Sequence, residues 1–430
     1  MARVMNDSGI EWIGKIPEGW GTNTAFQIFT QVKNKNEGLK EQNLLSLSYG
    51  KIKRKSIETV GGLLPENFDG YNIIEADDIV LRLTDLQNDQ KSLRVGISPE
   101  RGIVTSAYLT LRNRSTSLPE YLYYYLHAFD ISKGFYGMGA GVRQGLNWDG
   151  LKWLKILTPP VPEQEKIVSF LDAECARIDA VIEQTRASIE EYKKLKQSVI
   201  TEAVTKGIRP GRKMKDSGVE WIGEIPEEWH IDKIAKVASF HNGDRSSNYP
   251  SGDDIVDEGI LFVTSNNLGN IILNTNISSN KYITQEKYAA MRGAKLRIND
   301  IVFCLRGSVG KCSINKSFSE GTIASSLVVI RPESIDPDFL NYALQNPQIT
   351  ELAMLEAIGI GSQNLAAADI AGFKIPIPSE EDSESIVAYL KEKTLMIEEL
   401  IQKKLEVLTE LDSCKKSLIF EYVTGKKEVV

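Results

Sequence analysis

The chain repeats one of its own sequence blocks. Residues Asp7 to Trp20 (DSGIEWIGKIPEGW) return as Asp216 to Trp229 (DSGVEWIGEIPEEW), with eleven of the fourteen positions identical at an offset of 209. Repetition of this kind indicates that copies of one structural unit are joined in a single chain. The sequence therefore predicts a tandem duplication whose two similar halves form a pseudo-twofold molecule.

A second match shows which parts of each half are preserved. Gly102 to Arg112 (GIVTSAYLTLR) resembles Gly321 to Arg331 (GTIASSLVVIR), now at an offset of 219, so the segment before it has changed length. The match resumes at the ends of the halves, where Val204 and Thr205 correspond to Val423 and Thr424. Each half thus combines a shared frame with a middle of its own.

The composition is that of an ordinary soluble protein, with 42% hydrophobic and 25% charged residues among 430. No apolar run reaches the roughly 18 to 20 residues that span a bilayer, and no signal-peptide core follows Met1. We therefore expect a cytoplasmic protein without a membrane segment. The four cysteines and three histidines are scattered, without the short spacing of metal ligands, so we expect no metal site.

Two long stretches, starting at Pro162 and after Pro378, carry apolar residues at alternating steps of three and four. This heptad spacing predicts two long helices, each on the order of 60 Å, with Ser379 as the N-cap of the second. The predicted seams continue through Leu195 and Leu405. We assign to the helix interface the isoleucines Ile178, Ile182, Ile397 and Ile401.

Either helix alone would expose its seam, so we expect the two to pack on each other, antiparallel as pseudo-twofold symmetry requires. The alternative is that each helix buries its seam against its own domain. The same symmetry places Met1 to Trp20 beside the end of the second helix, near Thr424, so the two ends of the chain are expected to be neighbours.

The middles contain short β-like runs and short helices such as Pro119 to Ala128. The runs are Ile79–Leu83, Ile103–Leu111, Ile260–Thr264, Ile301–Leu305 and Ile323–Ile330. The predicted fold class is α+β, with two mixed α/β domains joined by two long antiparallel coiled-coil helices. The predicted segments are a repeat block (1–20), a first domain (21–158), a long helix (159–208), a linker with the second block (209–229), a second domain (230–377), a second long helix (378–425) and a tail (426–430).

The sequence offers no catalytic motif. The loop Gly307 to Lys311 resembles a phosphate-binding loop, but that motif requires four residues between its glycines and Ser or Thr after the lysine, where this chain has Cys312. The Asn/Asp-Pro-Pro-aromatic turn of an adenine methyltransferase is also missing. We therefore expect no intrinsic catalysis.

One dense basic cluster lies in the first middle, although the net charge of the chain is −7. The cluster follows Tyr49 and consists of Lys51, Lys53, Arg54 and Lys55. Clustered lysine and arginine side chains are what phosphate binding requires. A solvated strand edge is the alternative interpretation.

The arrangement of block, middle and long helix, occurring twice, resembles the specificity subunit of type I restriction-modification enzymes. The resemblance rests on the DSG-x-EWIG-x-IPE-x-W block and on the Pro-x-Pro segment that leads into an acidic helix start, at Pro160 to Glu165 and again at Pro376 to Glu381. The copies differ where Glu163-Gln164-Glu165 becomes Asp382-Ser383-Glu384, so a role of Gln164 is not expected in both halves.

The resemblance implies that the middles are target recognition domains, each recognising one half of an asymmetric bipartite site in double-stranded DNA, with the helices setting the spacer. In that family two modification subunits bind S-adenosylmethionine and methylate adenine, and two restriction subunits use ATP and Mg²⁺ to translocate and cut DNA. This chain itself is expected to bind no cofactor.

Further candidates for DNA contact are arginines and polar residues near strands and glycine-rich loops: Arg82, Arg94, Arg101, Arg143, Gln144, Arg306, Ser308, Lys311, Gln363 and Asn364. For the two glutamines, a role in holding a turn is the alternative. The tryptophans of the two blocks, Trp12, Trp20, Trp221 and Trp229, are interpreted as packing residues.

Two other classes of protein stay open. A stand-alone sequence-specific regulator would use the same domains to bind DNA without partner subunits. A coiled-coil scaffold for other proteins would bind no DNA, as the acidic net charge allows.

Overall fold

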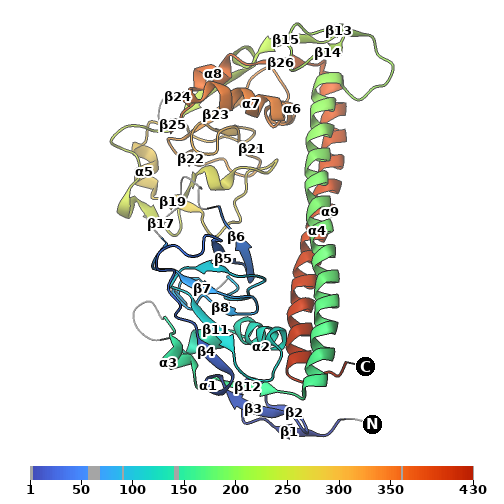
Figure 1. Ribbon diagram of the computed structural model, residues 1–430. Coiled ribbons are helices and arrows are strands. Elements are labelled where there is room, and N and C mark those ends of the chain that lie inside the picture. The colour runs from blue at the N-terminus through green and yellow to red at the C-terminus, as the bar shows by residue number, and fades with distance from the viewer. Residues whose placement is uncertain (1–2, 57–67, 90–91, 140–144, 360–361, 430) are drawn as a thin grey trace. The chain divides into compact units, whose positions relative to one another are not determined.

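The structure, a computed structural model, describes residues 3–56, 68–89, 92–139, 145–359 and 362–429 (Figure 1). Contacts divide the chain into two units, the first made of Met1–Thr185 with Leu405–Val430 and the second of Arg186–Lys404. Each unit therefore contains one repeat block, one domain and one half of each long helix. No helix in the described ranges is long and apolar enough to cross a membrane.

The first unit contains short strands and helices ahead of the long helix. Its strands are β1 (Met5–Asp7), β2 (Lys15–Pro17), β3 (Gly21–Thr24), β4 (Phe29–Gln31), β5 (Leu45–Ser48), β6 (Lys51–Arg54), β7 (Asn72–Ile74), β8 (Ile79–Leu81), β9 (Val95–Ile97), β10 (Gly102–Val104), β11 (Leu109–Asn113) and β12 (Lys155–Thr158). Its helices are α1 (Ala25–Ile28), α2 (Pro119–Ile131), the 3₁₀ turn η1 (Gly134–Gly137) and α3 (Trp148–Leu151).

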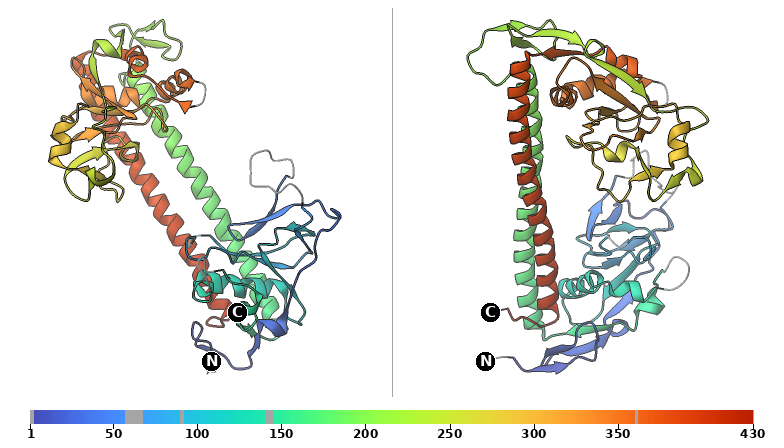
Figure 2. Two further views of the ribbon diagram at one scale, coloured as in Figure 1. Left: turned by 90° about the vertical axis from the view of Figure 1, so that its left-hand side faces the viewer. Right: turned by 180° about the vertical axis from the view of Figure 1, so that it is seen from behind.

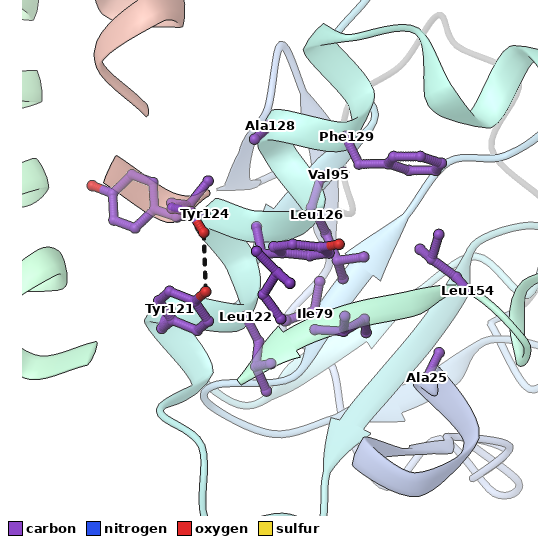
Figure 3. Packing of buried hydrophobic residues seen from close by; sticks show 14 of the residues in the cluster. Ala25, Ile79, Val95, Tyr121, Leu122, Tyr124, Leu126, Ala128, Phe129 and Leu154 are labelled. Atoms are coloured by element: carbon purple, nitrogen blue, oxygen red, sulfur yellow. Dashed lines mark hydrogen bonds between the residues drawn. The ribbon is translucent and has the colours of Figure 1, made fainter. Parts of the chain in front are cut away.

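An antiparallel sheet in the order β4-β11-β8-β9 forms the frame of this unit. Helix α2 covers the sheet. Its apolar residues recur at helical spacing and so form one face, which is buried against the strands. Leu122 and Leu126 lie in one buried cluster with Ile79 and Val95 of the sheet (Figure 3). The buried core of this unit therefore lies between the sheet and α2.

The second unit repeats this frame. Its strands are β13 (Met214–Asp216), β14 (Glu224–Pro226), β15 (His230–Lys233), β16 (Ala238–Asn242), β17 (Ile255–Val256), β18 (Ile260–Val263), β19 (Lys281–Ile283), β20 (Ile301–Cys304), β21 (Cys312–Ile314), β22 (Thr322–Ile323), β23 (Leu327–Pro332), β24 (Ile358–Gly359), β25 (Ser362–Gln363) and β26 (Lys374–Ile377). Its helices are η2 (Ile234–Lys236), η3 (Gly252–Asp254), η4 (Ser265–Asn267), α5 (Gln285–Ala290), α6 (Pro337–Leu344), α7 (Pro347–Glu356) and α8 (Ala367–Ala371).

The two frames agree strand by strand, whereas the middles differ. The order β16-β23-β20-β21 matches β4-β11-β8-β9, and the pair β15-β26 matches β3-β12. Between these strands the first unit has the hairpin β5-β6 and the pair β7-β10, whereas the second has a four-stranded sheet in the order β17-β19-β18-β22. The predicted division into a shared frame and divergent middles is confirmed.

The same ion pair, between an arginine and a buried aspartate, secures both frames. Arg112 forms two hydrogen bonds with the carboxylate of Asp78, at 2.8 and 2.7 Å, and Arg331 forms two with Asp300, both at 2.8 Å. Both aspartates are 1% exposed. Bidentate pairs of this kind fix geometry as well as charge, which explains why both matched stretches end on an arginine.

The long helices α4 (Val161–Lys206) and α9 (Glu380–Val423) pack against each other in each unit (Figure 2). In the first unit the rings of Phe170 and Tyr422 lie 4.4 Å apart and Lys415 donates to Asp179 at 2.6 Å. Rising residue numbers on α4 meet falling numbers on α9, so the helices are antiparallel.

The second unit shows the same direction, because Lys196 pairs with Glu398 and Lys404 lies over the Tyr192 ring at 5.6 Å. The predicted antiparallel pairing is therefore confirmed. Ile397 is buried at this interface, and Ile178, Ile182 and Ile401 are half-buried.

The predicted seam is wrong at two positions. Leu195 is 47% exposed and Leu405 is 44% exposed. Strict alternation of three- and four-residue steps runs from Tyr192 to Lys196 on α4 and from Ile401 to Lys404 on α9, so it misses each leucine by one residue. The inner positions at mid-helix are therefore Lys196 on α4 and Lys404 on α9, both half-buried.

The last tryptophan of each repeat block binds the first turn of a long helix. Trp20 Nε1 donates to Glu163 Oε2 at 2.9 Å, and Trp229 Nε1 donates to Asp382 Oδ2 at 2.9 Å. These carboxylates lie where the positive end of the helix dipole favours an anion. An arginine at equivalent positions of the two halves adds to each contact, since Arg3 binds Glu163 and Arg212 binds Asp382. This contact accounts for the repeated block.

The first tryptophans of the blocks pack among apolar residues. Trp12 lies against the rings of Tyr125, Phe129 and Phe420, at centroid distances of 5.3 to 6.0 Å. Trp221 packs against two of the buried clusters of the second unit.

The end of α9 lies beside the first repeat block, as predicted. Lys426 Nζ donates to the carbonyls of Ile13 and Lys15, at 2.7 and 2.6 Å. Tyr121 of α2 donates to the carbonyl of Val423, one of the last carbonyls of α9 that lack a helical partner.

Gln164 has a role that the second half lacks. Its side chain is 1% exposed, accepts from the Leu118 backbone at 2.8 Å and donates to the Pro159 carbonyl at 2.8 Å. The hydroxyl of Ser383, its counterpart, is buried without a hydrogen-bond partner among the residues described. The difference expected from the sequence is confirmed.

Two predicted strands are each interrupted. The run Ile103–Leu111 forms β10 and β11, and Ile323–Ile330 forms β22 and β23. Tight turns separate them, closed by backbone hydrogen bonds from Tyr108 to Thr105 and from Leu327 to Ala324, both 3.0 Å. Each turn moves the chain from one sheet to another, which apolar periodicity alone does not indicate.

We expect Asp382→Asn to destabilise the second unit by about 2–3 kcal/mol at pH 7, because Trp229 and Arg212 lose a charged acceptor. Burial alone would raise the pKa of Asp382, but hydrogen bonds from Arg212 and Trp229 outweigh it and hold the pKa below its ordinary value of 3.8. The stabilisation is thus present above pH 3.8 and is lost as the pH falls through the lower pKa of the folded state.

Urea unfolding at several pH values measures the free energy of unfolding of the substituted and unsubstituted chains. The difference between the two free energies should become smaller below pH 3.8. Glu381→Gln is the matched control, since Glu381 binds Arg209 with its side chain 79% exposed and such pairs contribute roughly 0–1 kcal/mol. Equal effects of the two substitutions would contradict the role given to Asp382.

Candidate nucleic-acid interface

The hairpin β5-β6 presents the basic cluster of the first domain (Figure 1). Lys51 pairs with Ser48 and Lys53 with Ser46 across the hairpin. Because side chains alternate between the faces of a strand, these polar residues share one face. The other face carries Ile52, which packs against a buried cluster. Lys51 and Lys53 are therefore held on the polar face.

The turn of this hairpin exposes Tyr49. Tyr49 and Gly50 have φ angles of 47° and 75°, the left-handed conformation that two-residue hairpin turns require. A Cβ on Gly50 would lie 3.2 Å from Leu93 Cβ, so the turn also passes close to the neighbouring loop. The Tyr49 side chain is 78% exposed and available to a ligand.

The basic residues of the hairpin differ in their partners. Arg54 forms a two-pronged ion pair with Glu100, and this hydrogen bond lowers the pKa of Glu100. Lys51 Nζ lies 3.4 Å from Asp179 on α4. Lys53 and Lys55 are exposed and form no ion pair with any residue that the structure describes. Their charges are thus the freest in the cluster.

Arg94 is unavailable to DNA, which corrects the prediction for this residue. Its side chain is fully buried, and its guanidinium donates to the carbonyls of Arg82, Thr84 and Asp85 and to the Tyr136 hydroxyl. Burying a guanidinium requires that its donors be satisfied, as they are here. Arg94 therefore organises the loop before β9.

The two other arginines predicted in this domain are partly accessible. Arg82 lies 3.8 Å from Asp89, with its side chain 38% exposed. Arg101 pairs with Glu41 and Glu75, at 3.1 and 2.7 Å. These acidic partners offset the charge that each arginine would offer to phosphate.

Some predicted residues lie outside the part that the structure describes. Arg143 and Gln144 belong to the segment 140–144, which is outside the described residues. Gln363 belongs to β25, but its side chain is not among those described. Their predicted contacts stay predictions.

Predicted residues of the second domain meet at one strand end. Arg306 and Asn364 form an antiparallel bridge, and Arg306 Nε donates to Asn364 Oδ1. Ser308 and Lys311 lie in the loop after β20 and line an open groove of about 1320 Å³. Lys196 and Glu398 of the long helices also line it. The groove is therefore mixed in charge.

Sequence reasoning missed Asp179. It lies 128 residues from Lys51 in the chain, so no local motif indicates their contact. No three His, Cys, Asp or Glu side chains in the described ranges are placed to hold a metal ion.

The fold and these surfaces define a class of protein with two divergent domains. Each domain has a polar, partly basic surface and is joined to the long helices by the same repeated frame. The family model for the type I restriction modification DNA specificity domain matches residues 17–191 and again 226–410. The chain belongs to this family, the specificity subunits of type I restriction-modification systems, which are non-catalytic components of their complexes.

Relatives extend over the whole chain. It is 27% identical to the provisionally named MjaX specificity subunit of a type I restriction enzyme from Methanocaldococcus jannaschii, over 97% of this chain and 96% of that protein. It is 25% identical to the MjaVIII specificity subunit of the same organism, over 77% and 75% of the two chains. A chain from a solved type I restriction-modification system shares the fold, with a TM-score of 0.69 at 16% identity over 96% and 99% of the two chains.

Replacing Lys53 and Lys55 together by alanine should weaken DNA binding evenly across sequences if they contact phosphates, because phosphate contacts carry no sequence information. The slope of log affinity against log salt should decrease by about 0.9 for each phosphate that the chain no longer neutralises. Arg54→Ala should reduce the slope less, because Glu100 already offsets that charge.

Fluorescence anisotropy of the chain assembled with its modification subunit, on several duplexes over a range of KCl, measures these slopes. An unchanged affinity would show that the cluster is a solvated strand edge and does not bind DNA. A weakening confined to one base position would instead make it a direct reader of sequence.

Proposed function

We propose that this chain recognises an asymmetric bipartite DNA site, with one half-site bound by each domain and the spacer set by α4 and α9. Base contacts from the two domains would determine sequence, and the frame and its phosphate contacts would position them. Adenine methylation in each half-site, and restriction, would be carried out by partner subunits.

The observation that carries this proposal is the contrast between frame and middle. Both units have the same sheet order, the same Asp–Arg pair and the same Trp–carboxylate contact. In the residues described, their middles differ in strand order, since the first has the hairpin β5-β6 and the pair β7-β10 where the second has a four-stranded sheet. A preserved frame with exchangeable surfaces suits a protein that must recognise two different half-sites.

The partners that we propose are two modification subunits and two restriction subunits. S-adenosylmethionine would bind to the former, and ATP and Mg²⁺ to the latter. The chain itself would bind no cofactor, in line with the spacing of the Gly307 to Lys311 loop, which does not meet the requirements of a nucleotide-binding loop. Family membership supports an assembly with these subunits.

Exchanging residues 21–158 for the corresponding domain of a relative tests the proposal. The hybrid, expressed with the modification subunit, should methylate a site in which one half has changed and the other half and the spacer have not. Genome-wide mapping of methylated adenine detects this result. The reciprocal exchange of residues 230–377 is the matched control and should alter only the other half.

A change in both halves after either exchange would contradict the assignment of one half-site to each domain. Tight, site-specific binding by the purified chain without any modification subunit would instead favour a stand-alone regulator. Absence of DNA binding by the assembled complex would favour a protein scaffold.

A further inference from the structure

Lys51 of the basic hairpin forms an ion pair with a residue of the long helices. The side chain of Lys51 is 68% exposed, and its ammonium lies 3.4 Å from the Asp179 carboxylate on α4. The same carboxylate accepts a hydrogen bond from Lys415 of α9 at 2.6 Å, and the Lys415 side chain is only 23% exposed. Asp179 therefore holds Lys415 closely and Lys51 loosely.

The hairpin turn lies above a small cavity at this point. Tyr49, Gly50 and Lys51 line a space of about 260 Å³ together with Asp172 and Asp179 of α4. The turn is thus not fully packed against the helices beneath it. Moving the Lys51 side chain away from α4 would break one long, exposed ion pair.

The two partners of Asp179 differ in strength. Partial burial alone would raise the pKa of Asp179, but the hydrogen bond and charge of Lys415 outweigh it, and Lys51 adds to the lowering. The carboxylate therefore stays charged at neutral pH. An exposed pair such as that with Lys51 is weak and is screened by salt, so a DNA phosphate can displace Asp179 from Lys51.

We propose that Asp179 competes with DNA phosphate for Lys51, and that Lys415 sets the strength of this competition by occupying the same carboxylate. This inference rests on the proposed function, because it requires the first domain to bind DNA. Asp179 is then a positioning residue that restrains sequence-independent binding. Its effect reaches DNA only through Lys51.

For Asp179→Asn, competition and a purely structural role predict changes in DNA affinity of opposite sign. With Asp179→Asn, Lys51 is released while the amide oxygen still accepts from Lys415, so affinity for a duplex of scrambled sequence should rise about two- to fivefold, the size expected for one exposed ion pair. With Lys415→Met, Lys51 is left as the cationic partner of Asp179, so the affinity for DNA should fall. If Asp179 only braces the hairpin, both substitutions should weaken binding.

Matched variants separate competition from net charge. Asp172→Asn removes the same charge two turns earlier on α4, where Asp172 accepts from Tyr124 rather than from Lys51. Lys416→Met removes the same charge beside Lys415, from a residue that pairs with Asp412. Asp172→Asn should not raise the DNA affinity as Asp179→Asn does. Lys416→Met should not lower it as Lys415→Met does. Lys51→Met should abolish the gain caused by Asp179→Asn.

The measurement is fluorescence anisotropy with the full chain assembled with its modification subunit. One duplex carries the site identified by methylation mapping, and the other has a scrambled sequence. The gain from Asp179→Asn should vanish as added salt shortens the screening length. A lower affinity in Asp179→Asn, an unchanged affinity, or a gain that persists in Lys51→Met would each overturn the inference. Equal affinity of the unsubstituted complex for both duplexes would instead contradict the proposed function itself.

Discussion

The apolar seam between α4 and α9 is the constraint on which the rest of the structure depends. Each helix contributes one part to the first unit and another to the second. The first unit therefore joins two separate stretches, Met1–Thr185 and Leu405–Val430, whereas the second is the continuous stretch Arg186–Lys404. In the first unit, Leu171 of α4 and Ile419 of α9 belong to the same buried cluster as the domain sheet. In the second unit, Ile200 and Leu390 belong to a buried cluster with Trp229 of the repeat block and Phe339 of α6. Since burial of apolar area dominates folding free energy, the helices cannot separate without exposing both cores.

The Trp–carboxylate contact joins each repeat block to this helical frame. Its chemistry explains why the block is preserved in both halves, since a buried indole N–H needs an acceptor and a helix N-terminus favours an anion. The acid is Glu163 in one half and Asp382 in the other, so the function of the contact is kept while the side-chain length changes. The middles are under no such constraint, which leaves their surfaces free to differ.

The sequence predicted the features that depend on periodicity and repetition, namely the duplication, the antiparallel helices and the neighbouring chain ends. It failed where long-range contacts decide. Arg94 has the type of side chain that contacts DNA, but it is buried, and the carbonyls of the loop before β9 accept hydrogen bonds from its guanidinium. Leu195 and Leu405 were assigned to the seam because they are apolar, but they are exposed because each lies one residue away from a strict heptad position. The contact of Asp179 with Lys51 depends on where a hairpin meets a helix, which no local pattern encodes.

The central claim of this account is that the paired helices determine the distance between the two half-sites. Deleting four residues from α4 near Thr185 and four from α9 near Thr409, which face each other in the register of the Asp179–Lys415 and Lys196–Glu398 pairs, shortens the pair by about 6 Å. The seam returns to nearly the same face, because four residues are close to one turn. The sites methylated by the assembled complex can then be mapped across a genome. The account predicts unchanged half-sites separated by a spacer shorter by one or two base pairs, at about 3.4 Å each. An unchanged spacer in a folded, active variant would contradict it.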